Sequence, residues 1–170
     1  RRMIEVLSQC YAAQYGVRST NLMVPNMYGP YDSPNPNKTH ALNALVIKFV
    51  SAMKYDRDEV EVWGTGRPVR EWLYVKDLAE LVRQVIESGQ HLIDPVNVAQ
   101  NSGLSVDELV AIIVERLGYQ GRTVKNLRYG DGSMKKVMDD TLFKTRFPAF
   151  KFTPFDLGLG ETIDYYKKVL

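Results

Sequence analysis

Apolar residues recur at intervals of three and four positions in several parts of the chain, the spacing that places them on one face of a helix. These intervals predict helices over residues 1–15, 40–54, 77–87, 109–118 and 160–169. Gly16 is expected to end the first helix, and Asn37 or Thr39 to cap the second. Ser105 and Glu108 match a capping box ahead of the fourth helix.

Short β-branched and apolar runs between these helices predict strands, at residues 18–24, 59–63, 71–75, 96–99 and 122–128. The run at 18–24 ends in continuous apolar residues, which is typical of a buried parallel strand with the preceding helix as its crossover. The glycines in "WGTGRPVREWLYV" (63–75) are sufficient for a hairpin between the strands at 59–63 and 71–75. Alternation of helices and strands predicts an α/β fold.

The segment "PNMYGPYDSPNPNK" (25–38) is rich in proline and asparagine and predicts a long loop without secondary structure. It follows a predicted parallel strand, and ligands of open parallel sheets bind beyond the carboxyl ends of strands. Asn26, with its amide, and Tyr28, with its hydroxyl, are therefore candidate ligand contacts. A turn in which Asn, Gly and Pro only shape the backbone explains the pattern equally well.

The charge balance argues against nucleic acid or an anionic membrane as the main partner, since 22 basic and 20 acidic residues leave a net charge of +2. Any anion is expected at a local site. No apolar run reaches the roughly 20 residues of a transmembrane helix, and we identify no metal-ligand pattern. The single cysteine, Cys10, suits a reducing compartment such as the cytoplasm and is expected to be a buried helix residue.

His40 is a candidate acid or base, because the ordinary histidine pKa near 6.5 allows proton exchange at neutral pH. It follows the long loop at the start of a predicted helix, so an ordinary helix-start role is the alternative. His91, beside a turn without other polar groups, is interpreted as structural.

Arg67, Arg70 and Lys48 could converge on an anion, and Trp63 could stack on a base or sugar. The alternatives are a surface ion pair of Arg70 with an acidic neighbour, Glu71 or Asp77, and a tryptophan that fills the core. The sequence contains neither a dinucleotide-binding glycine motif nor a P-loop. These residues alone leave the function open.

Three features taken together resemble the extended short-chain dehydrogenase/reductases that modify nucleotide sugars. They are "NMYGPYD", a histidine followed eight residues later by a basic residue, and "VWGTGRPVREWLYVKDLAE". The resemblance implies that a cofactor-binding glycine motif and a Tyr-x-x-x-Lys pair precede Arg1, which itself lies inside a predicted helix. We therefore expect the chain to be a piece of a longer protein, inactive by itself.

The implied fold is the C-terminal part of a Rossmann-type parallel sheet plus a smaller mixed α/β substrate-binding domain. Residues 1–30 would end the dinucleotide-binding domain, and residues 31–170 would mainly form the substrate-binding domain. Segments within about 70–100 would be able to return to the Rossmann sheet. The first helix would also pack in a homodimer.

The resemblance also implies roles for residues at the candidate sites. Pro25, Asn26 and Met27 would line the junction between the nicotinamide of NADP, with NAD as the alternative, and the sugar. Asn26 would also contact the nucleotide sugar. His40 would be the acid that returns a proton to the sugar during epimerisation.

The basic residues and the tryptophan would hold the GDP part of the substrate, through Lys48, Trp63 and Arg70. Lys136, or its neighbour Lys135, would close over the same phosphates. No role is implied for Arg67.

The implied activity of the complete protein is 3,5-epimerisation and NADPH-dependent 4-reduction of a GDP-linked 4-keto-6-deoxy sugar. Two alternative functions are compatible with the same fold. One is a 4-epimerase or dehydratase acting on another nucleotide sugar, against which the spacing of His40 argues. The other is a non-catalytic module that binds a nucleotide sugar.

Overall fold

The computed structural model describes residues 2–89, 91–92 and 94–170. Its helices are α1 (Arg2–Tyr15), α2 (Ala41–Lys54), α3 (Val75–Ser88), α4 (Val106–Leu117), α5 (Thr141–Arg146) and α6 (Phe155–Val169). Its strands are β1 (Leu22–Met23), β2 (Asn26–Tyr28), β3 (Glu59–Trp63), β4 (Val69–Arg70), β5 (Trp72–Tyr74), β6 (Val96–Asn97), β7 (Leu104–Ser105), β8 (Arg122–Asn126) and β9 (Lys135–Lys136).

Most strand pairs are parallel. The pairs β1–β6, β2–β5 and β3–β8 are parallel, whereas β4 pairs in parallel with β9 and antiparallel with β7. Parallel pairs require crossover connections, which the intervening helices supply. The predicted α/β class is therefore confirmed.

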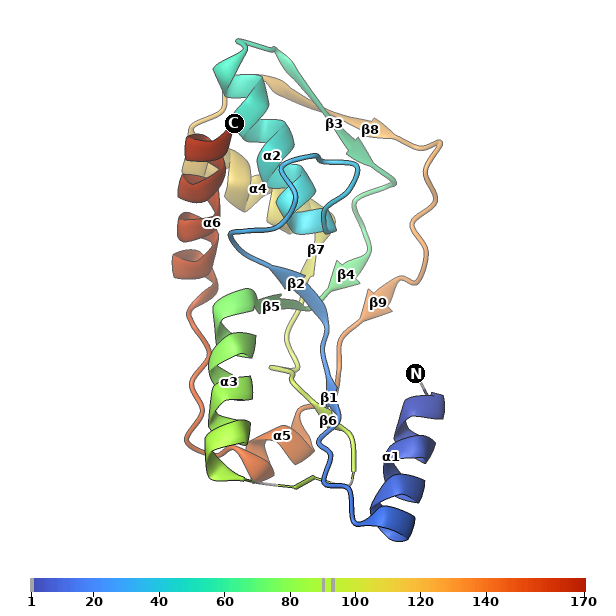
Figure 1. Cartoon of the computed structure of the whole chain (residues 1–170). Coiled ribbons are helices and arrows are strands. Elements are labelled where there is room, and N and C mark those ends of the chain that lie inside the picture. Colours follow the sequence, from blue (N-terminus) through green and yellow to red (C-terminus); the bar gives the residue numbers. More distant parts are fainter. Residues whose placement is uncertain (1, 90, 93) are drawn as a thin grey trace.

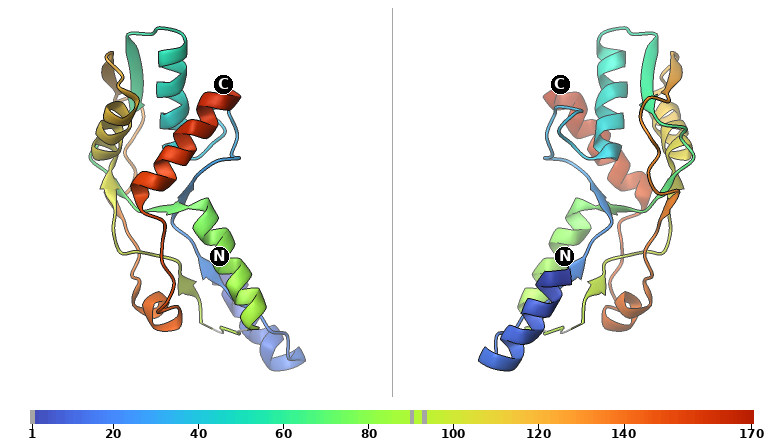
Figure 2. Two further views of the ribbon diagram at one scale, coloured as in Figure 1. Left: turned by 90° about the vertical axis from the view of Figure 1, so that its left-hand side faces the viewer. Right: turned by 90° about the vertical axis from the view of Figure 1, so that its right-hand side faces the viewer.

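The elements form two bodies joined at a waist (Figures 1 and 2). The upper body contains α2, α4, α6, β3 and β8, and the lower body contains α1, α3, α5, β1 and β6. In the lower body, α1 and α3 lie on opposite sides of the β1–β6 pair, a helix–sheet–helix arrangement (Figure 1).

The core of the upper body forms around α2, whose apolar residues recur at helical spacing. Leu42, Val46 and Phe49 are fully buried on its inward side. They belong to one apolar cluster with residues of α4, α6 and β3. Burying side chains of this size contributes about 1.5 to 3 kcal/mol each, which fixes α2 firmly.

A second, smaller core lies in the lower body and includes Leu81, Val96 and Phe143. Strand β5 contributes to both cores, because successive side chains of a strand point to opposite faces. Trp72 and Tyr74 belong to the upper cluster, whereas Leu73 belongs to the lower one. The waist is therefore built on a strand shared by both bodies.

Two predictions about strands were wrong. The segment at 25–38 is not entirely a loop, since Asn26–Tyr28 forms β2 beside β5. Pro25, which has no backbone N–H, lies between β1 and β2. The predicted hairpin is also absent from the described residues: β3 pairs with β8, and residues 71–75 pair through β5 with β2.

Several helix ends differ from the prediction. Neither Asn37 nor Thr39 caps α2; its N-cap is His40, without a side-chain cap bond. α3 begins at Val75 and α6 at Phe155, both earlier than expected, and the short helix α5 was missed. The capping box of Ser105 at the start of α4 is confirmed.

α6 packs closely on Tyr28, because a Cβ at Gly158 would lie 2.5 Å from the Tyr28 hydroxyl. Cys10, expected to be buried, is exposed on α1.

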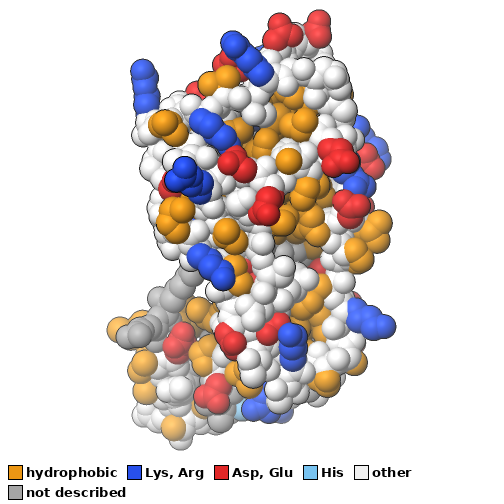
Figure 3. Space-filling model, turned by 180° about the vertical axis from the view of Figure 1, so that it is seen from behind, with side chains coloured by type: hydrophobic (Ala, Val, Ile, Leu, Met, Phe, Trp, Pro, Cys, Tyr) orange, Lys and Arg blue, Asp and Glu red, His pale blue; other side chains and the backbone are white. Residues whose placement is uncertain are grey.

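The surface carries no large field of one sign on the face seen in Figure 3, where acidic and basic side chains are interspersed with apolar ones. Within the described residues, no helix combines the length and apolar character required to cross a bilayer. Among those same residues, no group of three or more His, Cys, Asp or Glu side chains is placed to hold a metal ion.

Candidate functional site

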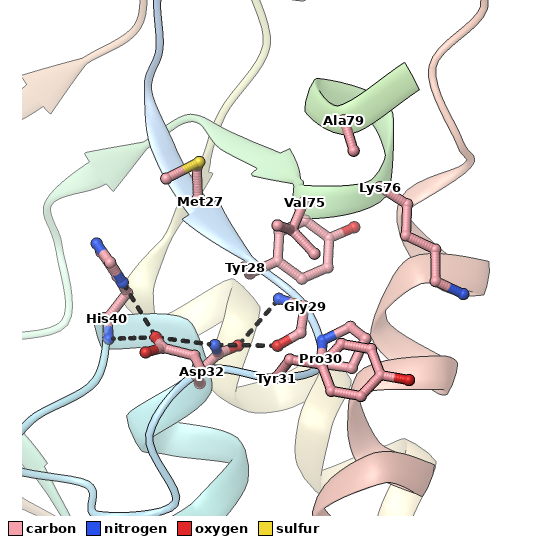
Figure 4. A pocket seen from close by; sticks show the side chains of 11 residues that line it. Met27, Tyr28, Gly29, Pro30, Tyr31, Asp32, His40, Val75, Lys76 and Ala79 are labelled. Carbon is pink, nitrogen blue, oxygen red and sulfur yellow. Dashed lines mark hydrogen bonds and ion pairs between the residues drawn. The ribbon is translucent and has the colours of Figure 1, made fainter. Parts of the chain in front are cut away.

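Two cavities flank the beginning of α2. The first, here called the His40 cavity, has a volume of about 410 Å³ and is lined by β2, the loop after it and the start of α3. Its lining includes Met27, Gly29, Asp32, His40 and Val75 (Figure 4). The wall is mostly apolar; Asp32, His40 and Asn43 lie together at the beginning of α2, and Lys76 lies at the start of α3.

His40 is tied to Asp32 by two contacts. Its backbone N–H donates to Asp32 Oδ2 at 3.2 Å, and its ring Nδ1 lies 3.1 Å from the same oxygen. The ring is largely exposed, and in Figure 4 its other nitrogen points away from Asp32. That nitrogen, Nε2, is therefore available for exchange of a proton with a bound molecule.

The charged state of Asp32 is strongly favoured. Partial burial by itself would raise the pKa of Asp32, but hydrogen bonds from Thr39, His40 and Ser33 hold it well below its usual value. Asn43 also donates to Asp32 Oδ2, at 3.3 Å. Asp32 is thus a fixed carboxylate beside His40, and the sequence analysis did not single it out.

Gly29 forms a tight part of the cavity wall, with φ at +142°, a conformation that other residues rarely adopt. Asn43 binds both its N–H, at 3.2 Å, and its carbonyl, at 3.1 Å. A Cβ at Gly29 would lie 2.4 Å from Val75 Cγ1. The wall therefore depends on glycine at this position.

Tyr28 is mostly a core residue, 2% exposed, and its remaining surface lines the His40 cavity. Its ring packs against Tyr74 and Phe155, and its hydroxyl lies against Gly158 of α6. Burial raises the pKa of Tyr28, and the Asp77 carboxylate adds to the effect. The phenol therefore stays neutral, and Tyr28 remains a candidate contact in the wall of this cavity.

The second cavity, here called the Lys48 cavity, has a volume of about 270 Å³ and is lined by α2, β3 and the loop before α2. It brings together Lys48 and Trp63, two of the predicted nucleotide-binding residues. Lys48 Nζ donates to the Glu61 carbonyl at 3.0 Å and lies 4.6 Å from the centre of the Trp63 ring. The cavity thus combines a cation with aromatic and apolar surface.

Trp63 does not fill the core, since it is 42% exposed; the buried tryptophan of this region is Trp72. The Trp63 ring stacks on Tyr129, with centroids 4.0 Å apart. Tyr129 lies in the loop after β8, and the sequence analysis missed it. Only the parallel pairing of β3 with β8 brings the two rings together, and that pairing is not visible in the sequence.

Arg70 and Lys136 are neighbours across the β4–β9 pair, where the register places them opposite each other. Neither lines the His40 or the Lys48 cavity. The Arg70 guanidinium donates to the carbonyls of Val69, at 2.9 Å, and Asp131, at 3.0 Å. It makes no ion pair with Glu71 or Asp77 among the described contacts.

Those two acidic residues have other partners. Glu71 accepts hydrogen bonds from the backbone N–H groups of Gln100 and Met138, and Asp77 accepts from Thr153. The alternative explanation of Arg70 as half of a surface ion pair is therefore wrong.

The remaining candidates are spread around these elements. Asn26 donates to the Glu71 carbonyl at 3.3 Å, and neither Asn26 nor Pro25 lines either of the two cavities. Arg67 is exposed. His91 accepts the Ser19 N–H through Nδ1 at 3.0 Å, which supports its structural interpretation.

Comparison with known proteins identifies the family of the chain. Residues 1–99 match the NAD dependent epimerase/dehydratase family. The chain is 36% identical over 160 residues to a probable GDP-L-fucose synthase 1 of Oryza sativa, covering 94% of this chain and 48% of the relative. It is 34% identical over 168 residues to the GDP-L-fucose synthase of Escherichia coli, covering 94% and 52%.

Among solved structures, a GDP-L-fucose synthetase of Naegleria fowleri bound to NADP superposes with a TM-score of 0.86 at 25% identity. The match covers 98% of this chain and 54% of that one. The chain belongs to the NAD dependent epimerase/dehydratase family. It spans about half the length of the GDP-L-fucose synthases that it matches.

Proposed function

We propose that this chain is the substrate-binding part of a GDP-L-fucose synthase. The full-length protein would convert GDP-4-keto-6-deoxymannose to GDP-L-fucose by epimerisation at C3 and C5 and NADPH-dependent reduction at C4. The observation that carries the proposal is the arrangement of α2, with His40 in one cavity and Lys48 in the other. Eight residues of helix separate them by about 12 Å along the axis.

The His40 cavity suits a nicotinamide ring beside a sugar. The walls formed by Met27, Gly29 and Val75 are apolar, and Gly29 allows close approach of the backbone. NADPH, when bound, supplies the hydride that reduces C4. Met27 would contact the nicotinamide, with Pro25 and Asn26 beside it at the start of β2, and most of the cofactor would be held by other parts of the protein.

His40 would act in the epimerisation. The C4 ketone acidifies the protons at C3 and C5, so transfer of either proton to a base supplied by another part of the full-length protein would give an enolate. His40 Nε2 would then donate a proton to the enolate carbon, on the face opposite to the one from which the proton was removed. The His40 imidazolium would thereby become neutral imidazole. The exposure of Nε2 and the fixed Asp32 carboxylate support this role.

The nucleotide would lie against the Lys48 cavity. Lys48 would neutralise part of the diphosphate charge, and Trp63 would flank the nucleotide. Arg70 and Lys136, adjacent across β4–β9, would approach the same phosphates from the neighbouring strands. Asn26 would contact the sugar through its amide.

The division of the chain follows from the same proposal. Residues 1–30 would end the dinucleotide-binding domain and residues 31–170 would mainly form the substrate-binding domain. The pairing of β6 with β1 supports a return of part of 70–100 to the Rossmann sheet. The single cysteine suits the cytoplasm as the compartment.

We further propose that α1 packs in a homodimer. Apolar side chains of this helix are exposed, among them Ile4, Leu7 and Tyr11. Exposed apolar surface of this kind marks contact surfaces. Light scattering of the full-length protein should give a dimer mass at micromolar concentration, and a monomer there would contradict the proposal.

Substitution of His40 tests the proposed chemistry directly. His40→Gln keeps size and some hydrogen bonding but removes the exchangeable proton, at a typical cost of about 10²- to 10⁴-fold in epimerisation. The full-length variant, given the 4-keto substrate and NADPH in deuterated water, should incorporate little deuterium at C3 or C5. It should still reduce the ketone and release unepimerised product.

His91→Gln is the matched control, because His91 lies outside both cavities. It should incorporate deuterium as the parent does. Deuterium incorporation at the parental level in His40→Gln would show that His40 does not transfer a proton in the epimerisation. It would favour a 4-epimerase or dehydratase activity instead.

A further inference from the structure

Asp32 Oδ2 is the common acceptor of a cluster of donors. It accepts the His40 backbone N–H at 3.2 Å and the Asn43 amide at 3.3 Å, and the ring Nδ1 of His40 lies 3.1 Å away. The Thr39 hydroxyl donates to the same oxygen, and the Ser33 N–H donates to Oδ1 at 2.7 Å. One carboxylate thus organises the end of the loop and the beginning of α2.

The contact with the ring decides where the histidine proton lies. An ionised carboxylate can only accept hydrogen bonds, so the nitrogen facing it must carry a hydrogen. In neutral His40 the hydrogen is then on Nδ1, and the lone pair is on Nε2. In charged His40 the second proton is on Nε2, the nitrogen that points away from Asp32 (Figure 4).

Asp32 is itself held in place. Asn43 binds Asp32 and also both backbone groups of Gly29, which joins the carboxylate to the opposite wall of the His40 cavity. Asn43 is 1% exposed on α2. Asp32 therefore cannot shift without disturbing a buried, fully bonded amide, and rigid support of this kind is what a reacting group requires.

We propose that Asp32 is the positioning residue of His40: it fixes the ring with a hydrogen on Nδ1 and presents Nε2 to the sugar. The inference rests on the proposed role of His40 in proton transfer. The competing explanation is a purely structural contact, in which Asp32 only binds backbone and hydroxyl groups at the start of α2. The two explanations differ in the tautomer of His40.

The test is the tautomer of His40 in the full-length protein. Nitrogen NMR of protein labelled with ¹⁵N-histidine distinguishes the two neutral tautomers, and the His40→Gln variant assigns the signal. We expect the hydrogen on Nδ1 in the parent and a shift of the hydrogen to Nε2 in Asp32→Ala. A parent with the hydrogen on Nε2 overturns the proposal, whether or not any variant folds.

Activity gives the second readout. Asp32→Asn keeps the size of the side chain but removes the charge that stabilises the imidazolium. We expect deuterium incorporation from solvent to fall by about 10²-fold, as for loss of general acid catalysis, with GDP affinity unchanged. Equal loss of epimerisation, reduction and GDP affinity would instead indicate a structural role.

Asp164→Asn is the matched control, since Asp164 is an exposed residue of α6 that lines neither cavity. It should leave the tautomer and the activity at parental values. The two proposals fail separately. Parental deuterium incorporation in His40→Gln contradicts the proposed function, whereas the wrong tautomer contradicts only the role of Asp32.

Discussion

The His40 and Lys48 cavities begin at the same helix end but are built differently. In the His40 cavity, Asp32 and Asn43 are held by several hydrogen bonds that join α2 to the wall at Gly29. In the Lys48 cavity, the Lys48 amine has one backbone acceptor, and Trp63 stacks on an exposed loop and donates one hydrogen bond, to the exposed Glu61 carboxylate at 2.8 Å. Proton transfer requires fixed geometry, whereas binding of a flexible diphosphate tolerates adaptable side chains.

The largest effect should come from Gly29→Ala, which adds a methyl group to the wall of the His40 cavity. Strain at φ +142° and the contact with Val75 should together cost about 2 to 6 kcal/mol of the free energy of unfolding. Urea denaturation of the full-length protein measures this. Gly132→Ala is the control, because Gly132 has φ +65° and open space around it, so only strain applies. Equal decreases in the free energy of unfolding of both variants would show that the wall at Gly29 is not tightly packed.

Arg70→Ala should have an intermediate effect, on binding rather than turnover. Loss of a charge-assisted phosphate contact costs about 1.5 to 3 kcal/mol, so the Kd for GDP should rise roughly tenfold to hundredfold. Calorimetry with GDP measures this value. The exposed Arg67 is the control, and Arg67→Ala should bind within a few-fold of the parent. Unchanged affinity in Arg70→Ala would mean that Arg70 serves only the carbonyls of Val69 and Asp131.

The smallest effect should be the pH dependence of nucleotide binding. Partial burial lowers the pKa of Lys48, and the Glu61 carboxylate opposes the shift. Lys48 therefore loses its charge at a lower pH than an ordinary lysine, and its contribution of about 1 kcal/mol, roughly fivefold in Kd, is lost as pH rises. Lys48→Arg should remove this dependence above neutral pH, since arginine stays charged. The same pH profile in the parent and in Lys48→Arg would show that Lys48 does not contact the phosphates.

Local patterns in the sequence predicted the helices better than the strands. The periodic positions of α2 and the capping box of α4 are local signals, and both helices formed where expected. The partner of β3 is some 60 residues away in β8, so glycines between β3 and β5 suggested a hairpin that did not form. α6 also begins at Phe155, earlier than the predicted start at residue 160.

The site could be predicted only in part, for the same reason. His40 and Lys48 were predicted from their residue types and from the eight-residue spacing in the family resemblance, and the structure places each at a cavity. Asp32 and Tyr129 were missed because each lies in a loop, and only folding places it against its partner. Nothing in the loop sequence around Asp32 indicates that its carboxylate will contact the His40 ring.

The shared strand β5 has a consequence for how the sequence can change over evolutionary time. Trp72 and Tyr74 pack in one core and Leu73 packs in the other, so substitutions at adjacent positions are constrained by different neighbouring residues. A change of volume at Leu73 calls for compensation from α3 or α5, whereas a change at Trp72 or Tyr74 calls for it from α2 or α6. Three consecutive positions should therefore covary with two separate sets of residues.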